Sequence, residues 1–201
     1  MKIFVLISFF LLLFSYSNEF VPSLVIERVE KQYDRFAKNR FVALAKIMQK
    51  LESADTNAKL EKINEFFNSV KYGDDKDIYA NTDYWATPFE FLARDKGDCE
   101  DYVIAKYFAL KHLGIPTNKL FLSYVRVEGK TEAHMVLTYF ETPSSEPLIL
   151  DSLRKIIFPA SKRVDLKPVF NFNPDILEDG KKTAAHKKWD ELMQRIKENK
   201  I

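Results

Sequence analysis

Cys99 is the only cysteine in the chain, and it stands at a position where a nucleophile is expected. It follows Asp98 at the predicted start of a helix, where free backbone N–H groups and the helix dipole favour a thiolate. A nucleophilic cysteine also needs an imidazole base, and usually a third group that orients the base. With one cysteine, neither an intrachain disulfide nor a multi-cysteine zinc site can form.

Among the three histidines, His134 is the candidate base. His112 lies at the far end of the helix that Cys99 begins, and His186 lies in a lysine-rich segment near the end of the chain. His134 falls within a predicted strand, and the next strand carries Asp151 in the apolar sequence LILDSL. If the two strands form a hairpin in which His134 lies directly opposite Asp151, the centre of the turn falls next to Pro143, in the loop predicted between the strands. Directly opposed residues point to the same face of the sheet. The spacing therefore predicts a Cys-His-Asp site, although each residue alone could be an ordinary core residue.

Three carboxylates, Asp98, Glu100 and Asp101, surround Cys99 in the sequence GDCEDY. Without compensation, their charges would raise the pKa of the thiol and oppose formation of the thiolate. A hard cation bound by oxygen ligands would cancel this charge. From the residues alone, however, capping of the first helical turn is the simpler interpretation.

Helical periodicity dominates the region before the candidate site. Apolar residues at helical spacing predict one long helix over residues 24–51 and a second over residues 55–70. Residues 73–77 are expected to form a polar loop. The sequence TPFE at residues 87–90 predicts a capping box with proline at the first helical position. The helix that starts at Cys99 is expected to end before Gly114.

After residue 116 the hydrophobic period changes from 3.6 to 2. Strands are predicted over residues 120–127, 133–140 and 148–153, with short connections between them. Neighbouring strands with short connections form an antiparallel meander. The expected fold is therefore α+β, with N-terminal helices and the nucleophile-bearing helix packed on an antiparallel sheet.

Composition excludes several classes of protein. The 31 basic and 29 acidic residues give a net charge of +2, which does not indicate a nucleic-acid-binding surface. Neither GxGxxG nor GxxxxGK[ST] occurs, so the common phosphate-binding loops are not expected.

The N-terminal residues predict export. Lys2 precedes an uncharged apolar run at residues 3–14, and small residues follow. This pattern is typical of a secretory signal peptide, here residues 1–17, because a spanning helix needs roughly 20 apolar residues. We expect residues 18–201 to form one domain that ends in a basic helix. An uncleaved membrane anchor is the alternative.

In several separate motifs, the chain resembles the bacterial transglutaminase-like cysteine proteinases. These motifs are DYWATPFEFL at residues 83–92, GDCEDY at 97–102, AHMVL at 133–137, LD at 150–151, PASKR at 159–163 and PVFNFN at 168–173. The resemblance implies a papain- or transglutaminase-like core in which Cys99 is the nucleophile, His134 the base and Asp151 the orienting acid. This agrees with the assignment made from the residues.

The resemblance also implies a cofactor, a substrate and a compartment. Members of the family bind Ca²⁺ beside the cysteine, which favours Asp98, Glu100 and Asp101 as metal ligands over helix caps. Calcium takes about six to eight oxygens, so these residues alone cannot complete its shell. The implied activity is a periplasmic endopeptidase that cuts a large surface adhesin at an Ala-Ala bond near its N-terminus, and so promotes biofilm dispersal. An inner-membrane cyclic-di-GMP receptor that sequesters the protease is an implied partner.

Two other functions fit the same residues. A transglutaminase-type acyl transferase would use the same Cys-His-Asp site but pass the acyl group to an amine instead of water. A non-catalytic calcium-binding adaptor would bind calcium and leave Cys99 unreactive. Product masses with and without added amine distinguish the first, and alkylation of the thiol at neutral pH distinguishes the second.

Overall fold

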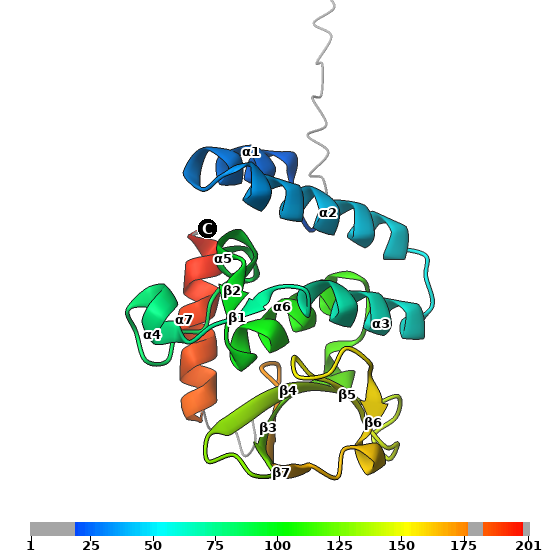
Figure 1. Ribbon diagram of the computed structural model, residues 1–201. Helices are drawn as coiled ribbons and strands as arrows, with labels where there is room; N and C mark the ends of the chain where they lie inside the picture. The colour runs from blue at the N-terminus through cyan, green and yellow to red at the C-terminus, as the bar shows by residue number, and fades with distance from the viewer. Residues whose placement is uncertain (1–18, 177–182, 199–201) are drawn as a thin grey trace, which may run out of the picture.

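The computed structural model describes residues 19–176 and 183–198. The predicted signal peptide, residues 1–17, lies outside the described residues. A layer of helices covers one face of an antiparallel sheet, and the nucleophile-bearing helix α6 lies between the other helices and the sheet (Figure 1). The predicted α+β class and the packing of α6 on an antiparallel sheet are confirmed.

Most helices begin where the sequence predicts, with two exceptions. They are α1 (Ser23–Gln32), α2 (Arg35–Leu51), α3 (Thr56–Phe67), α4 (Asp75–Tyr79), α5 (Pro88–Arg94), α6 (Cys99–His112) and α7 (Ala184–Lys197), with 3₁₀ turns η1 (Thr117–Lys119) and η2 (Ala160–Lys162). The single helix predicted over residues 24–51 is wrong. Asp34 accepts a hydrogen bond from the Ala37 N–H at 2.7 Å, so it caps a new helix and separates α1 from α2. The predicted polar loop at residues 73–77 instead contains the start of α4.

The main sheet has five strands in the order β6-β5-β4-β3-β7. Its members are β3 (Leu120–Val127), β4 (Ala133–Tyr139), β5 (Leu148–Leu150), β6 (Phe158–Pro159) and β7 (Leu166–Phe172). The predicted meander is β3-β4-β5, whereas β6 and β7 were not predicted. A separate parallel pair joins β1 (Lys71–Tyr72) to β2 (Lys96–Gly97), just before α6.

The register between β4 and β5 corrects one detail of the predicted site. Leu137 lies opposite Leu150, so continuation of the ladder would place Asp151 opposite Val136, two residues from His134. Direct opposition of His134 and Asp151 is therefore wrong. Because side chains alternate with a period of two, a shift of two residues keeps both on the same face, where diagonal neighbours can still touch.

Helix α6 is at the centre of the core. It contacts α3, α5 and β4, and its residues are buried around most of its circumference, including the ring of Tyr107. The C-terminal helix α7 packs on it through Trp189, whose ring stacks on Phe108 with centroids 5.3 Å apart. No helix in the described part of the chain is both long and apolar enough to cross a membrane. This central position fixes the N-terminus of α6, and hence Cys99, against the sheet.

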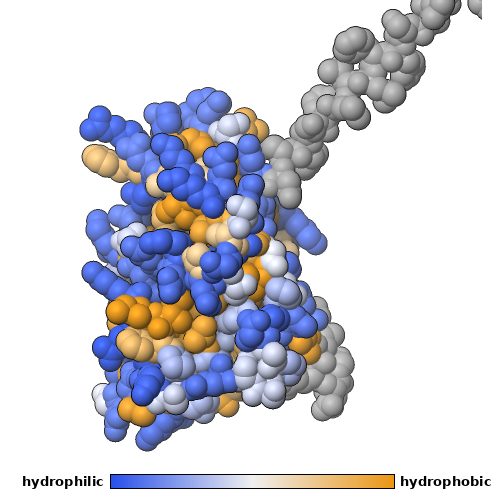
Figure 2. Space-filling model, turned by 90° about the vertical axis from the view of Figure 1, so that its right-hand side faces the viewer, coloured by the Kyte–Doolittle hydropathy of each residue, from blue (hydrophilic) through white to orange (hydrophobic). Residues whose placement is uncertain are grey.

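The sheet is strongly curled, so its edge strands β6 and β7 turn toward each other on the side away from α6 (Figure 1). Inside this curl a small second cluster forms from Val125, Val136 and Ile149, and Ala160 and Leu166 pack against it. The outer surface is mixed: Figure 2 shows hydrophilic side chains around scattered apolar groups on one face. Such a mixture is ordinary for globular proteins.

Candidate active site

The position of Cys99 is fixed by the close packing of Gly97, which lies just before α6, against Asp101 and Phe91. A Cβ at Gly97 would lie 2.5 Å from both the Asp101 Oδ2 and the Phe91 Cδ2 atoms, closer than real Cβ contacts. Tyr102 donates a hydrogen bond from its hydroxyl to the Val70 carbonyl at 2.6 Å, which ties the first turn of α6 to the segment before β1. The close packing before Cys99 therefore requires glycine, and the helix N-terminus is anchored from both sides.

The Cys99 thiol is nearly buried, with 8% of the residue exposed, and donates to Glu100 Oε2 at 2.8 Å. Burial, followed by the Glu100 carboxylate, raises the pKa of the thiol well above its ordinary value. The backbone N–H of Met135 hydrogen-bonds the sulfur and acts in the opposite direction on this pKa. That contact places the sulfur beside the residue that follows His134.

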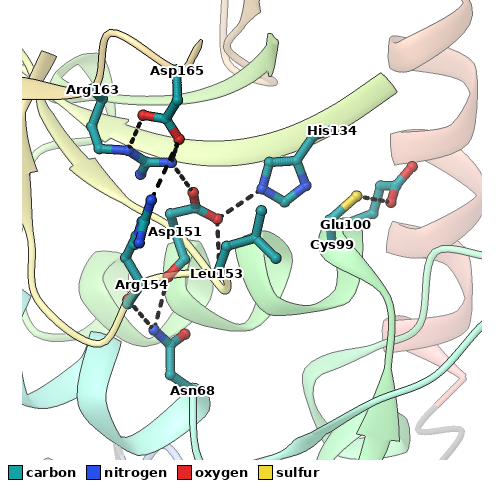
Figure 3. Close-up of polar contacts among 9 residues, drawn as sticks. All are labelled: Asn68, Cys99, Glu100, His134, Asp151, Leu153, Arg154, Arg163 and Asp165. Carbon is teal, nitrogen blue, oxygen red and sulfur yellow. Dashed lines mark hydrogen bonds and ion pairs between the residues drawn. The ribbon is translucent and has the colours of Figure 1, made fainter. Parts of the chain in front are cut away.

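His134 and Asp151 are brought together as predicted. The His134 Nε2 and Asp151 Oδ1 atoms are 2.7 Å apart, and the imidazole lies between the Asp151 carboxylate and the Cys99 side chain in Figure 3. Both groups are buried. An ionised carboxylate only accepts hydrogen bonds, so Nε2 carries a proton and donates the hydrogen bond to Asp151 Oδ1. In the neutral imidazole, Nδ1 is then the basic nitrogen.

Asp151 is held by four hydrogen bonds. Its Oδ1 also accepts from the Leu153 N–H at 2.9 Å, and its Oδ2 accepts from Arg163 Nη2 at 2.8 Å. Its backbone carbonyl accepts from the Asn68 side-chain amide at 2.8 Å (Figure 3). Burial alone would raise the pKa of Asp151, but the hydrogen bonds from His134, Leu153 and Arg163 outweigh it and lower this pKa to about 2. Asp151 is therefore ionised across the physiological range.

On the other side of Cys99, the fold brings three aspartates together. One carboxylate oxygen from each of Asp75, Asp98 and Asp101 lies within 4.8 Å of the other two. Sequence reasoning missed Asp75, which comes from α4. The structure does not bring Glu100 into this group, since its carboxylate accepts the hydrogen bond of the Cys99 thiol instead.

Each aspartate of this cluster has a buried oxygen without a protein partner. Among the described residues, Asp75 Oδ1, Asp98 Oδ1 and Asp101 Oδ2 make no hydrogen bond. Asp98 also makes no side-chain cap to α6, so helix capping does not explain its presence. Burial and the surrounding carboxylates, Glu100 first, raise the pKa of Asp98 to about 9. Burial likewise raises the pKa of Asp75 and of Asp101.

This set of donors suits a hard cation. Carboxylate oxygens are ligands that Ca²⁺ prefers; each of the three aspartates has an unpartnered oxygen, and one carboxylate oxygen of each lies within 4.8 Å of the other two. A bound cation would satisfy these oxygens and remove the mutual repulsion of the three charges. The residues present therefore fit a calcium ion.

Comparison with known proteins identifies the family. The model of the bacterial transglutaminase-like cysteine proteinases matches residues 34–163. The chain belongs to this family. The resemblance drawn from the sequence motifs is thereby confirmed.

Solved structures of Legionella pneumophila LapG are similar to this family member. The calcium-bound form is 40% identical with a TM-score of 0.73, over 85% of this chain and 97% of that one. The EGTA-treated form is 39% identical with a TM-score of 0.72, over 85% of this chain and 96% of that one. Among curated protein sequences, none matches significantly.

The remaining histidines lie apart from this site. The His112 ring is 5.2 Å from that of Phe20, and His186 belongs to the capping box at the start of α7. Their structural surroundings agree with setting both aside as candidate bases.

Proposed function

We propose that the protein is a periplasmic, calcium-dependent cysteine endopeptidase that cleaves a large surface adhesin near its N-terminus, at an Ala-Ala bond. Release of the adhesin would promote biofilm dispersal. The observation that carries the catalytic part is the His134 Nε2–Asp151 hydrogen bond, which leaves Nδ1 as the basic nitrogen of an imidazole next to Cys99. Family membership supports the same activity.

The first half of the reaction is acylation. His134 Nδ1 takes the proton of the Cys99 thiol. The resulting thiolate attacks the carbonyl carbon of the scissile peptide, so a C–S bond forms and negative charge moves to the carbonyl oxygen. The Cys99 N–H has no acceptor within α6, because it belongs to the first residue of the helix, and it is a natural donor to this oxygen. His134 Nδ1 then gives the proton that it took from the thiol to the departing amine, as the tetrahedral intermediate collapses and the C–N bond breaks.

The second half is hydrolysis of the acyl-enzyme. His134 Nδ1 takes a proton from water while the water oxygen attacks the acyl carbon. Collapse of the second tetrahedral intermediate breaks the C–S bond and releases the carboxylic acid with the thiolate restored. Asp151 keeps the imidazole in the required tautomer and stabilises its protonated form through both halves.

Calcium binding rests on the aspartate cluster and on the calcium-bound form of the related LapG. Asp75, Asp98 and Asp101 would hold the ion, which would supply positive charge beside Cys99. The chain itself places these carboxylates at the start of α6, where the charge of Asp98 raises the pKa of the Cys99 thiol. Glu100 would lie next to this site, with its carboxylate bonded to the Cys99 thiol.

The decisive experiment is cleavage of the N-terminal region of a candidate adhesin by the purified protein. We expect two fragments separated at an Ala-Ala bond with calcium, and intact substrate with EGTA or with Cys99→Ala. Mass spectrometry with an added primary amine tests the acyl transferase alternative, which requires an amine-modified fragment. An adaptor would cleave nothing and would leave Cys99 unreactive toward iodoacetamide at neutral pH in both conditions.

Export and sequestration belong to the same proposal and rest on the N-terminal apolar run and on the family resemblance. Cell fractionation followed by N-terminal sequencing of the mature protein tests the signal peptide at residues 1–17. A mature chain that retains residues 3–14 in the membrane fraction would support the anchor instead. Binding to the periplasmic part of a cyclic-di-GMP receptor is measurable by calorimetry.

A further inference from the structure

Arg163 is a buried arginine that the reaction above does not use. Only 4% of its side chain is exposed, and it follows η2 in the segment that leads into β7. Burial of a guanidinium is costly unless its charge is paired and its N–H groups are bonded. Its surroundings therefore show what this residue does.

Arg163 is paired with two carboxylates at once. Its Nε donates to Asp165 Oδ1 and its Nη2 to Asp165 Oδ2, both at 2.9 Å. The same Nη2 donates to Asp151 Oδ2 at 2.8 Å. A planar guanidinium held by a bidentate carboxylate has a fixed orientation, so the hydrogen bond to Asp151 has a fixed direction (Figure 3).

This contact divides the two oxygens of Asp151 between two tasks. Oδ1 accepts from His134 and from the Leu153 N–H, whereas Oδ2 accepts from Arg163. The terminal torsion of an aspartate is broad and roughly two-fold, so a carboxylate bound through one oxygen can turn. Occupation of Oδ2 by Arg163 prevents this rotation and keeps Oδ1 directed at the imidazole.

The curl of the sheet brings Arg163 to this place. The segment from η2 to β7 crosses the face of the sheet that points away from α6, and Ala160 and Leu166 pack on Val125, Val136 and Ile149. His134 belongs to this same face by strand parity, and Asp151 directly follows the end of β5 and bonds the imidazole of His134. The second apolar cluster therefore fixes the backbone on both sides of Arg163.

We propose that Arg163, clamped by Asp165, is a positioning residue for the reaction: it holds the Asp151 carboxylate in the orientation that sets the tautomer of His134. This inference rests on the proposed peptidase function, in which His134 is the base. Arg163 acts through Asp151 and not on the substrate.

The first test measures the imidazole itself and needs no substrate. Long-range ¹H–¹⁵N correlation spectra of the purified protein report the tautomer of His134, identified by comparison with His134→Ala. We expect the Nε2–H tautomer in the wild type and a mixture of tautomers in Arg163→Met. The matched control is Arg154→Met, because Arg154 lies 3.9 Å from the same Asp165 carboxylate but is 56% exposed. An unchanged Nε2–H signal in Arg163→Met would refute the proposal.

The second test is a double-mutant cycle on adhesin-peptide cleavage. Arg163→Met should lower kcat about 10- to 100-fold with little change in KM, as is usual for a partner that orients a catalytic group. In an Asp151→Asn background the same change should cost less than about threefold, because the group through which Arg163 acts is already altered. Losses that multiply in the double variant would show that Arg163 is merely structural. Arg163→Lys should restore part of kcat, since it keeps the charge but not the bidentate fork.

Arg163→Met could fail to fold, so a second variant keeps the arginine and changes its partner Asp165 instead. Asp165→Asn loosens the clamp at a side chain that is 30% exposed and leaves Asp151 and Arg163 in place. We expect the same direction of tautomer change, smaller than in Arg163→Met, and wild-type behaviour would overturn the role of the clamp. If the wild type cleaves no adhesin peptide, the proposed function fails, and the tautomer measurement still decides the role of Arg163.

Discussion

Lys106 lies in the middle of α6 and is the most unusual charge in the described part of the protein. Its side chain is fully buried, and its Nζ has no hydrogen-bond partner among the described residues. The Tyr102 ring, whose centroid is 5.9 Å from Nζ, is an aromatic contact to the cation. Burial lowers the pKa of Lys106 to about 7, while the Asp151 carboxylate acts in the opposite direction. We therefore expect Lys106→Met to stabilise the protein.

The size of this gain depends on pH. A pKa that falls from 10.5 to about 7 on folding corresponds to roughly 5 kcal/mol of destabilisation at low pH, at 1.36 kcal/mol per unit. The penalty is fully present below pH 7, where the lysine is charged in both states. It disappears as the pH rises toward 10.5, because the folded state then binds fewer protons than the unfolded state. Structural relaxation reduces such penalties, so we expect a gain of about 2–4 kcal/mol at pH 6 that falls by about 2 kcal/mol by pH 9.

Urea unfolding at pH 6, 7, 8 and 9 in EGTA measures this difference directly. Other titrating groups are common to both proteins, so the change in the difference between wild type and Lys106→Met isolates Lys106. The control is Lys111→Met, since Lys111 is on the same helix and its Nζ lies 5.8 Å from the Tyr107 centroid, but its side chain is 45% exposed. We expect a change below about 0.5 kcal/mol at each pH for this control. Parallel stability curves for wild type and Lys106→Met would show that Lys106 carries no penalty from burial of its charge.

Three further outcomes follow from the site. Asp151→Asn should lower kcat by about 10²- to 10⁴-fold without abolishing cleavage, measured by steady-state kinetics, because the tautomer of the imidazole is no longer fixed; activity equal to wild type would contradict its role. Asp75→Asn should weaken calcium binding in calorimetry at least tenfold, whereas Asp77→Asn, an exposed position on the same helix, should not. Gly97→Ala should cost about 1–3 kcal/mol in urea unfolding, because its Cβ would meet Phe91. Gly73→Ala should cost less, since its Cβ would meet only the flexible Lys96 side chain, and equal losses would refute the steric argument.

The candidate pair of His134 and Asp151 could be predicted because strand parity tolerates an error of two residues. The assumed pairing was displaced from the observed register, yet the two side chains remained on one face and within reach. An error of one residue would have separated them across the sheet. The prediction depended on the alternation of side chains, which the sequence shows directly, and not on the register, which the β4–β5 loop determines.

The break between α1 and α2 could not be predicted from periodicity. Val29 before the break and Phe41 after it are both buried in the same core, so the apolar stripe runs on through the interruption. Only the side chain of Asp34, which bonds the Ala37 N–H, marks the new start. An aspartate within a charged stretch is a weak signal, because it is equally compatible with an exposed helical position.

Asp75 and Arg163 were missed for a different reason: their roles exist only in the tertiary structure. Asp75 lies in the sequence GDDKD, whose composition predicts a loop, and its burial results from the packing of α4 near β2 and the start of α6. Arg163 stands in the sequence PASKR, which carries part of the family resemblance, but nothing in the order of residues places it against Asp151. A buried charged residue is recognised by its partners, and those partners are distant in sequence.

The charge of Asp151 and the charges of the aspartate cluster (Asp75, Asp98 and Asp101) are compensated in opposite ways, and this contrast bears on the proposed calcium ion. Asp151 is satisfied by donors of the chain itself, including Arg163, and its pKa falls to about 2. The charges that act most strongly on Asp98 are all negative, and its pKa rises to about 9. The protein pairs Asp151 with a buried arginine, but it provides no donor for one oxygen of each of Asp75, Asp98 and Asp101 among the described residues. The negative charge of these three aspartates is therefore expected to be neutralised by a bound cation. We therefore expect calcium to change the stability of the entry to α6, while the His134–Asp151 pair remains formed in EGTA, as the tautomer of His134 will show.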